Sequence, residues 1–243
     1  MRARHVFFEV PATLGPLMRS LPMRGTLLAA GEPLPQADHH CPLLSLPLAF
    51  GTEAQTIPGG VPYLKAADAA VAAWRERLCS LPGLKVGVNW QGHPGTEKQP
   101  WIRGRSFALS SMAPLAGVPG VSLVSLQKGA AAAERLTVEF AGALAQPTDP
   151  LDTGPHALLE TAALMCALDL VITSDTSVAH LAGALGVPVW VALQAVPDWR
   201  WLLEGSESPW YPTARLFRQR EPGDWPELFH RVTQQLAALA QQR

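Results

Sequence analysis

The stretch from Asp169 to Leu193 constrains the fold of this chain more than any other. It reads DLVITSDTSVAHLAGALGVPVWVAL: an apolar run at 170–172, a polar turn, a helix-like segment rich in small residues, and a second apolar run at 187–193. Short apolar runs bounded by turn residues are typical of buried strands, and small residues allow a helix to lie close to a sheet. The stretch therefore predicts a βαβ unit.

The polar turn of this unit is a candidate anion site. It contains Ser174, Asp175, Thr176 and Ser177. These side chains gather where a helix begins, and the unpaired N–H groups and dipole of a helix N-terminus attract anions. His180 follows one turn later, so its ring can lean back and donate to a phosphate oxygen or a sugar hydroxyl. The turn alone is equally consistent with Asp175 or Ser177 capping the helix while His180 packs on a neighbour.

Size and charge limit the function classes. The chain has 243 residues, enough for one large or two modest domains, and a net charge of −1 from scattered charges. This charge argues against a nucleic-acid surface. Cys41, Cys79 and Cys166 lie far apart, which predicts buried, reduced thiols, no disulfide and a cytoplasmic location. We expect no signal peptide and no membrane span.

Prolines and glycines at 56–64 predict a linker between two regions. We expect a small α/β region at 1–64, a larger one at 65–223 and a docked amphipathic helix at 224–243. In the small region, strands are expected at 5–10 and 26–30 and helices at 12–20 and 42–50. In the larger region, strands at 85–90, 121–127, 170–173, 187–192 and 214–218 alternate with helices at 66–80, 109–116, 130–140, 157–168 and 177–185. The alternation predicts a doubly wound parallel sheet.

Polar residues at the predicted strand ends extend the candidate site, because ligands of such sheets bind beyond the carboxyl ends of the strands. Gln91 follows one strand and Lys128 another, and the loop after Gln91 contains Lys98, Arg103 and Arg105. A basic loop that faces a helix N-terminus can hold a diphosphate from two sides, and Arg105 is the preferred clamp. An alternative interpretation of Lys98, Lys128 and Arg103 is that they are solvated cations without a partner.

Three segments resemble a family of glycosyltransferases. They are 125–136 (SLQKGAAAAERL), 159–193, which includes the βαβ unit, and 197–225 (PDWRWLLEGSESPWYPTARLFRQREPGDW). Together they look like the glycosyltransferase domain of bacterial tetratricopeptide-repeat proteins, which is similar to the ADP-heptose lipopolysaccharide heptosyltransferases. The resemblance implies a GT-B-like α/β fold with two Rossmann-like domains, of which the carboxy-terminal one is complete.

The resemblance implies a nucleotide-diphosphate sugar as the donor substrate, with no other cofactor and no metal. The residues that it places near the diphosphate and sugar are Asp175, Thr176, Ser177, His180 and Arg105, the last in an RSF motif. It extends to Lys128, Gln91 and Trp90. Negative charge builds on the departing diphosphate during transfer, so Arg105 and His180 are expected to stabilise the leaving group electrostatically.

One difference from the family concerns the catalytic base. Its members begin with a strand and a glycine-rich loop that carries an acidic residue regarded as the base, and this chain starts after that element. We therefore expect a truncated amino-terminal domain, and we assign no catalytic base. Glu9 is the one candidate to replace that base, but a role as a surface residue is favoured for it. Three explanations stay open: a shortened gene product, a fragment completed by another chain, or a degenerate protein that binds without turnover.

Two functions follow from these patterns. The first is a glycosyltransferase whose acceptor is a glycan, a lipid-linked sugar or a protein. The alternative is a non-catalytic module that binds a nucleotide or docks on a protein partner through the open edge of its amino-terminal sheet.

Other chemistries lack their motifs. The chain has no GxGxxG after a strand, no GxxxxGK[ST] and no GxSxG. His39, His40 and Cys41 are contiguous and lack the spacing of metal ligands. The tryptophans at 199, 201, 210 and 225 are expected to form a packing cluster rather than a platform for sugar.

Overall fold

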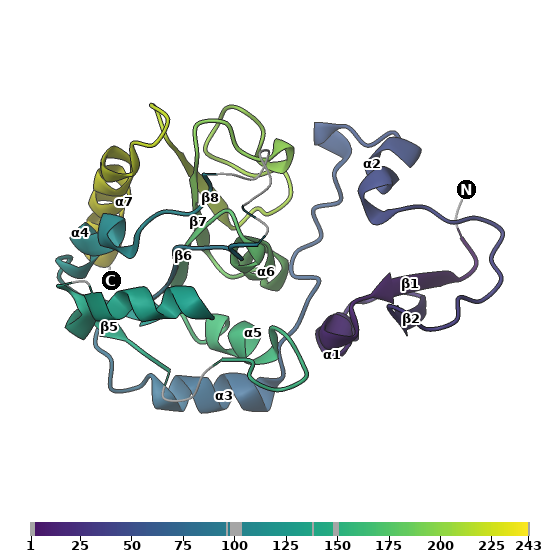
Figure 1. Ribbon diagram of the computed structural model, residues 1–243, viewed down its shortest axis with the longest axis horizontal. Coiled ribbons are helices and arrows are strands. Elements are labelled where there is room, and N and C mark those ends of the chain that lie inside the picture. Colours follow the sequence, from purple (N-terminus) through teal and green to yellow (C-terminus); the bar gives the residue numbers. More distant parts are fainter. Residues whose placement is uncertain (1–2, 96, 98–103, 138, 148–150, 243) are drawn as a thin grey trace.

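The structure is a computed structural model that describes residues 3–95, 97, 104–137, 139–147 and 151–242. Its two parts lie side by side in Figure 1. Residues 3–64, the amino-terminal unit, surround a two-stranded sheet, and the residues from 65 onward, the carboxy-terminal unit, surround a six-stranded sheet. The domain boundary at residue 64 stays a prediction, although the two sheets lie on either side of it.

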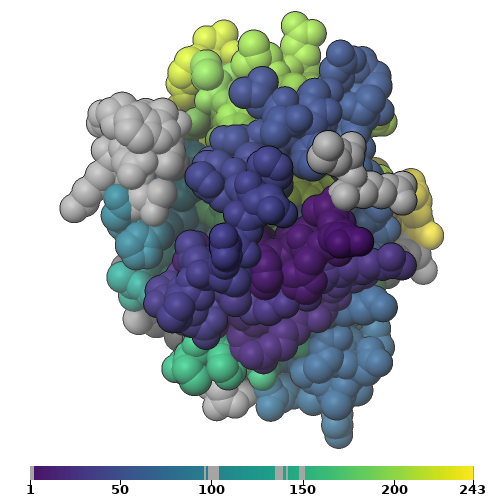
Figure 2. All heavy atoms as spheres, turned by 90° about the vertical axis from the view of Figure 1, so that its right-hand side faces the viewer, coloured from purple at the N-terminus to yellow at the C-terminus, as the bar shows by residue number. Residues whose placement is uncertain are grey.

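The amino-terminal unit is built on a parallel strand pair. β1 (Val6–Val10) pairs with β2 (Gly25–Ala29), and η1 (Ala12–Leu14) and α1 (Gly15–Met18) connect them. The short helices η2 (Leu43–Ser45), α2 (Leu46–Ala49) and η3 (Ala54–Thr56) follow. Gly25 allows this pairing, because a Cβ there would lie 2.1 Å from the carbonyl oxygen of Val6. Figure 2 looks onto this unit, which lies in front of the carboxy-terminal unit.

The carboxy-terminal unit confirms the predicted α/β fold with a parallel sheet. Its strands are β3 (Leu84–Asn89), β4 (Val121–Ser125), β5 (Leu144–Ala145), β6 (Leu170–Ser174), β7 (Val189–Leu193) and β8 (Ala214–Arg218). Its helices are α3 (Asp68–Arg77), η4 (Leu109–Met112), α4 (Ala113–Ala116), η5 (Ala130–Thr137), η6 (Ala141–Ala143), α5 (Leu159–Met165), α6 (Ser177–Leu185), η7 (Trp199–Trp201) and α7 (Trp225–Ala240). All strand pairs in this sheet are parallel.

The strand order places a topological switch point in the middle of the sheet. The order is β5-β4-β3-β6-β7-β8, so the chain winds outward from β3 through β4 to β5 and then returns to β6, on the other side of β3. In open parallel sheets, ligands bind in the crevice outside the carboxyl ends of the strands at such a point. The fold therefore directs attention to the ends of β3 and β6.

Two layers of helices cover the sheet, as Figure 1 shows. On one face α3, α5 and α6 bury Trp74, Leu164 and Leu181, and on the other α4 and α7 bury Leu115 and Phe229. Successive residues of β6 alternate between these two clusters, because side chains of a strand point to opposite faces. Burial on both faces explains why the strands are continuously apolar.

Three local expectations differ from the structure. The helix expected at 130–140 is a 3-10 helix, η5, that ends at Thr137. The edge strand β5 has two residues, too few for a periodic pattern, and the sequence did not predict it. Cys41 and Cys79 are exposed rather than buried, because both lie outside the packed layers; all three cysteines are free.

Within the described residues, no helix combines the length and hydropathy needed to cross a bilayer.

Candidate functional site

Two amide side chains tie the strands together at the switch point. At the end of β3, Asn89 Oδ1 accepts hydrogen bonds from the hydroxyls of Thr173 and Thr176, each at 3.1 Å. Asn89 Nδ2 donates to Gln127 Oε1 at 2.8 Å, and this oxygen also accepts from the backbone N–H groups of Trp90 and Gln91. The ends of β3, β4 and β6 are thus fixed relative to one another. Sequence reasoning missed Asn89, whose side-chain partners Gln127, Thr173 and Thr176 lie 38 to 87 residues away.

Thr176 begins α6 at this edge of the sheet. It is the N-cap residue, with its hydroxyl accepting from the backbone N–H of Val178 at 3.3 Å, so capping by Thr176 replaces the predicted alternative of capping by Asp175 or Ser177. Ser177 is exposed. The Ser174 hydroxyl is buried and has no hydrogen-bond partner among the described residues. The N–H groups of Val178 and Ala179 both donate to Thr176, so at the start of α6 the Ser177 N–H is the one without a partner among the described residues.

Asp175 is a buried carboxyl with only 8% of its surface exposed. Burial raises its pKa above the usual range, and the like charge of Asp198 acts in the same direction. The Trp201 indole and the guanidinium groups of Arg105 and Arg200 oppose this rise. A second negative group against Asp175 would be unfavourable, whereas a hydroxyl donor would be stabilised.

His180 lies one turn into α6 and is neutral at physiological pH. Burial lowers its pKa to about 4, and the positive charges of Arg200 and Arg105 contribute to the decrease. The ring stacks on Trp201, with centroids 5.1 Å apart, and Nδ1 is 3.0 Å from the Tyr211 hydroxyl. A neutral imidazole can donate one hydrogen bond to a ligand but brings no positive charge.

Arg105 lies at the same edge of the sheet as the start of α6. A Cβ on Gly92, just after β3, would lie 2.8 Å from the Arg105 guanidinium, and one on Gly104 would lie 3.0 Å from Gln194, just after β7. Because β6 lies between β3 and β7, the loop passes across the end of β6. The Arg105 charge acts on both Asp175 and His180.

Glu97 holds the Arg105 side chain in this structure. Its carboxylate is 3.3 Å from Arg105 Nε and also accepts from the Ser106 hydroxyl. The arginine is only partly exposed, so this pairing keeps it folded against the sheet edge. Lys98 and Arg103, the other basic residues predicted in this loop, lie outside the described residues.

Lys128, Gln91 and Trp90 make structural contacts. The Lys128 ammonium is 2.6 Å from the Asp152 carboxylate, which also accepts from the backbone N–H of Glu160, in the first turn of α5. The Trp90 indole is fully buried and donates to Glu134, as does the Gln91 amide. The expectation that Trp90 contacts the donor is corrected here, because its ring lies in the core.

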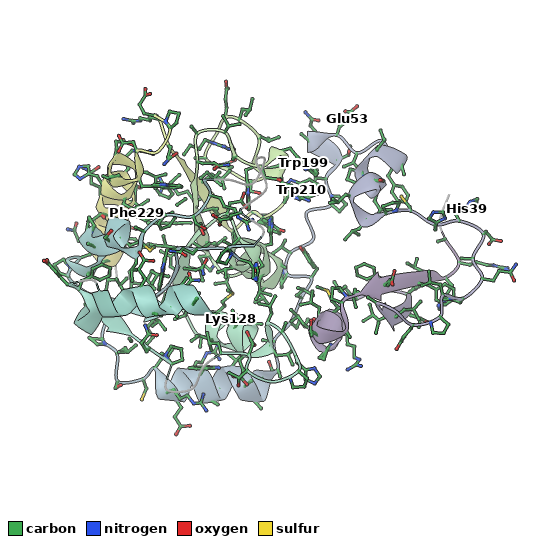
Figure 3. All side chains as sticks on the ribbon, viewed as in Figure 1. His39, Glu53, Lys128, Trp199, Trp210 and Phe229 are labelled. Carbon is green, nitrogen blue, oxygen red and sulfur yellow. The ribbon has the colours of Figure 1, made fainter. Side chains whose placement is uncertain are left out.

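A cleft of about 980 Å³ lies between the two units, next to His180. From the amino-terminal unit it is lined by Leu43, Leu44, Leu46, Pro47, Phe50, Thr52, Thr56, Pro58 and Tyr63. From the carboxy-terminal unit it is lined by His180, Trp199, Arg200, Trp210 and Tyr211. Figure 3 shows Trp199 and Trp210 on the side that faces the amino-terminal unit, with Glu53 across from them. The cleft is largely apolar and aromatic.

The tryptophans do not form one packing cluster. Trp201 is fully buried under His180, and Trp225 packs on Phe107 at the opposite face of the sheet. Trp199 is 55% exposed and carries the Arg200 guanidinium 4.7 Å above its ring. The expectation of packing is therefore correct for Trp201 and Trp225 and wrong for Trp199, which lines the cleft.

Arg218 fixes the turn that carries these tryptophans. From the end of β8 its guanidinium donates to the carbonyl groups of Trp201, Leu202, Glu204 and Gly205. Four carbonyl oxygens around one cation hold the loop against the sheet. No sequence signal marked this arginine, because its acceptors are backbone groups of a loop whose path is set by tertiary packing.

Comparisons with known proteins identify the fold. No protein-family profile matches the chain. It is 35% identical over 196 residues to Protein FlbA of Caulobacter vibrioides, which covers 77% of this chain and 31% of that protein. Among solved structures it is similar to the E. coli ADP-heptose LPS heptosyltransferase II, with a TM-score of 0.51 and 18% identity over 79% of this chain and 57% of that one.

A second solved structure, the glycosyl transferase family 9 protein from Veillonella parvula, gives a TM-score of 0.43 at 20% identity, covering 68% of this chain and 44% of that one. The chain spans about a third of the length of the curated relative it matches. Its fold is that of the GT-B heptosyltransferase, an α/β fold with a six-stranded parallel sheet.

Proposed function

We propose that the protein binds a nucleotide-diphosphate sugar at the start of α6 and transfers the glycosyl group to an acceptor held in the cleft. The observation that carries this proposal is the convergence at the switch point: the Arg105 charge acts on Asp175 and His180 at the start of α6, and the His180 ring lines the cleft. The GT-B fold supports it, since the neighbour with that fold is named as a heptosyltransferase.

The diphosphate binds between α6 and the Arg105 loop. The Ser177 backbone N–H at the start of α6 donates to one of its oxygens, and the positive end of the helix dipole favours its charge. Arg105 leaves Glu97 to pair with the diphosphate, whose charge exceeds that of one carboxylate. His180 donates a neutral hydrogen bond from the next turn of the helix.

This arrangement lowers the barrier by stabilising the leaving group. The bond from the anomeric carbon to the phosphate oxygen breaks, the bonding electrons remain on the diphosphate, and fixed N–H groups and a guanidinium favour that charge. Asp175 has a different task. A buried carboxyl beside the diphosphate would be repelled, so Asp175 accepts a hydrogen bond from a hydroxyl of the sugar.

The acceptor lies in the cleft between Phe50 and the Trp199 ring, where aromatic faces can stack on apolar surfaces. Whether the acceptor is a glycan, a lipid-linked sugar or a protein is a separate question from donor binding. Our proposal does not include Lys128 in the donor site, because its ammonium is paired with Asp152; its predicted contact with the donor stays a prediction.

One observation favours a second function, nucleotide binding without transfer. None of the residues that the structure shows lining the cleft is an aspartate or glutamate. Glycosyl transfer generally needs a base on the acceptor hydroxyl, worth about 10²- to 10⁴-fold in rate. The alternative role as a binding module requires the donor site but no base.

Calorimetric titration with ADP, GDP and UDP tests the donor site, and ADP is tried first because the heptosyltransferase that shares this fold is named for ADP-heptose. We expect His180→Ala and Arg105→Ala each to weaken binding by about 1–3 kcal/mol. His230→Ala and Arg75→Ala, on the exposed faces of α7 and α3, are the matched controls. Unchanged affinity in both site variants would contradict the assignment.

A donor hydrolysis assay then separates the two functions. Release of nucleoside diphosphate from a nucleotide sugar supports the transferase. Binding without any release supports the binding module, and the absence of binding to all three nucleotides removes both.

A further inference from the structure

Tyr211 holds the His180 ring at its Nδ1 edge. The Tyr211 hydroxyl is 3.0 Å from Nδ1, while the Trp201 ring stacks on one face of the imidazole at an interplanar angle of 16°. His180 also lines the cleft, so with Nδ1 occupied, Nε2 is the ring nitrogen that a ligand can reach. The contacts fix both the orientation of the ring and the nitrogen that it presents.

Gly183 leaves the space on α6 that the Tyr211 ring occupies. A Cβ at Gly183 would lie 2.4 Å from the Tyr211 ring, a distance that no real side chain tolerates. His180 and Gly183 are three residues apart and share one face of α6. The phenol therefore lies flat against the helix, with its hydroxyl reaching back to His180. Tyr211 is buried, with 8% of its surface exposed.

The linker between the two units adds a second phenol. The backbone N–H groups of Tyr63 and Leu64 donate to the carbonyl oxygen of Ala184, at 3.0 and 3.1 Å, which fixes the linker along α6. Burial raises the pKa of Tyr211 above its ordinary value, and so do the charge of the neighbouring Tyr63 hydroxyl and a hydrogen bond with it. Tyr211 therefore remains a neutral phenol that can donate a hydrogen bond.

The chemistry of neutral imidazole determines what this contact does. One ring nitrogen carries a proton and the other accepts a hydrogen bond. A phenol O–H is a strong donor, and its oxygen is a weak acceptor because its lone pair is delocalised into the ring. A Tyr211 hydroxyl that donates to Nδ1 leaves the proton on Nε2.

We propose that Tyr211 is a positioning residue for His180, donating to Nδ1 so that Nε2–H points into the cleft and donates to an oxygen of the diphosphate. The identity of that acceptor oxygen rests on the proposed function; the tautomer and its control by Tyr211 do not. Without the phenol, the ring would divide between two tautomers, and one of these presents a lone pair to a phosphate oxygen.

NMR of ¹⁵N-labelled protein tests the tautomer directly. Two-bond ¹H–¹⁵N correlations distinguish Nε2–H from Nδ1–H, and His180→Asn identifies the His180 signals. We expect the Nε2–H tautomer in the wild type at pH 7 and a mixture in Tyr211→Phe, which retains the ring on Gly183. Tyr63→Phe, a second phenol-to-phenyl change next to the same site, is the matched control and should leave the Nε2–H form dominant. A thermal unfolding midpoint close to that of the wild type shows that each variant is folded.

Titration with ADP provides the functional readout. Loss of one neutral hydrogen bond weakens binding by about 5-fold, so Tyr211→Phe should bind ADP about 5-fold more weakly. The same change in a His180→Ala background should have no effect, because a positioning residue acts through His180. A wild type with Nδ1–H, or a Tyr211→Phe variant with the unaltered tautomer, overturns the proposal. Failure of the wild type to bind any nucleotide overturns the proposed function instead and leaves the NMR result standing.

Discussion

The two units of the molecule differ in how they bury their apolar side chains. The carboxy-terminal unit covers both faces of its sheet and holds nearly all of the buried residues. In the amino-terminal unit, Val10, Leu17 and Leu64 are buried, while the large side chains that lie at the surface include Leu43, Leu44, Leu48 and Phe50, which are 61–87% exposed. Parallel sheets are normally covered on both faces, and two-stranded sheets are marginal by themselves.

The two units therefore contribute differently to the molecule: one contributes most of the packed core, and the other contributes the apolar wall of the cleft. The carboxy-terminal unit contains most of the buried apolar side chains and the residues of the proposed donor site. The amino-terminal unit leaves apolar groups uncovered, and Leu43, Leu44 and Phe50 among them line the cleft. Exposed apolar side chains gathered at a cleft are typical of a binding surface.

The largest expected effect is on the free energy of unfolding, and it is a comparison between one phenylalanine in each unit. Phe229 is fully buried and Phe50 is 73% exposed. We expect Phe229→Ala to lower the free energy of unfolding by about 3–5 kcal/mol through loss of packing, and Phe50→Ala to change it by less than about 0.5 kcal/mol. Urea unfolding followed by circular dichroism measures both. Equal losses would show that the two units contribute alike to stability.

The next effect is on the pH dependence of the free energy of unfolding, and we expect it to come from His180 on α6. Folded His180 has a pKa of about 4, below the value of 6.5 expected in the unfolded chain, so the unfolded state binds more protons between these values. The free energy of unfolding should therefore fall by about 2 kcal/mol from pH 7 to pH 5. In His180→Asn this decrease should be largely absent, as measured by urea unfolding at the two pH values.

A smaller loss is expected at the amide that joins the strand ends. Asn89→Ala leaves the Thr173 and Thr176 hydroxyls without their shared acceptor, at a cost of about 1–2 kcal/mol. Gln235→Ala, which removes an exposed amide on α7, is the control and should have little effect. Chemical denaturation compares the two. An unchanged free energy of unfolding in Asn89→Ala would show that this side chain does not hold the switch point together.

The smallest effect is expected for Lys128. Its ammonium is held by Asp152, so Lys128→Met should change ADP affinity by less than about 0.5 kcal/mol, whereas Arg105→Met should weaken it about tenfold. Calorimetric titration of both variants gives the comparison. A large loss in Lys128→Met would mean that the lysine leaves Asp152 to bind the nucleotide.

Local patterns predicted the central βαβ unit well. The strand expected at 170–173 is β6, the helix expected at 177–185 is α6 to the residue, and the strand expected at 187–192 is β7 with a shift of one or two residues. These elements are signalled within short windows, by apolar runs and by a capping hydroxyl. Trp90 was misinterpreted because a tryptophan at a strand end gives no indication of which way its ring points.

The order of residues along the chain was sufficient to specify the alternation of strands and helices and the polar turn before α6, because these depend on neighbours a few positions apart. Only the folded chain decided that Asn89 joins three strand ends, that Asp152 takes Lys128 and that Tyr211 rests on Gly183 beside His180. Each of those contacts joins groups 24 to 87 residues apart, and their partners are selected by packing of the sheet and its helices rather than by local preference.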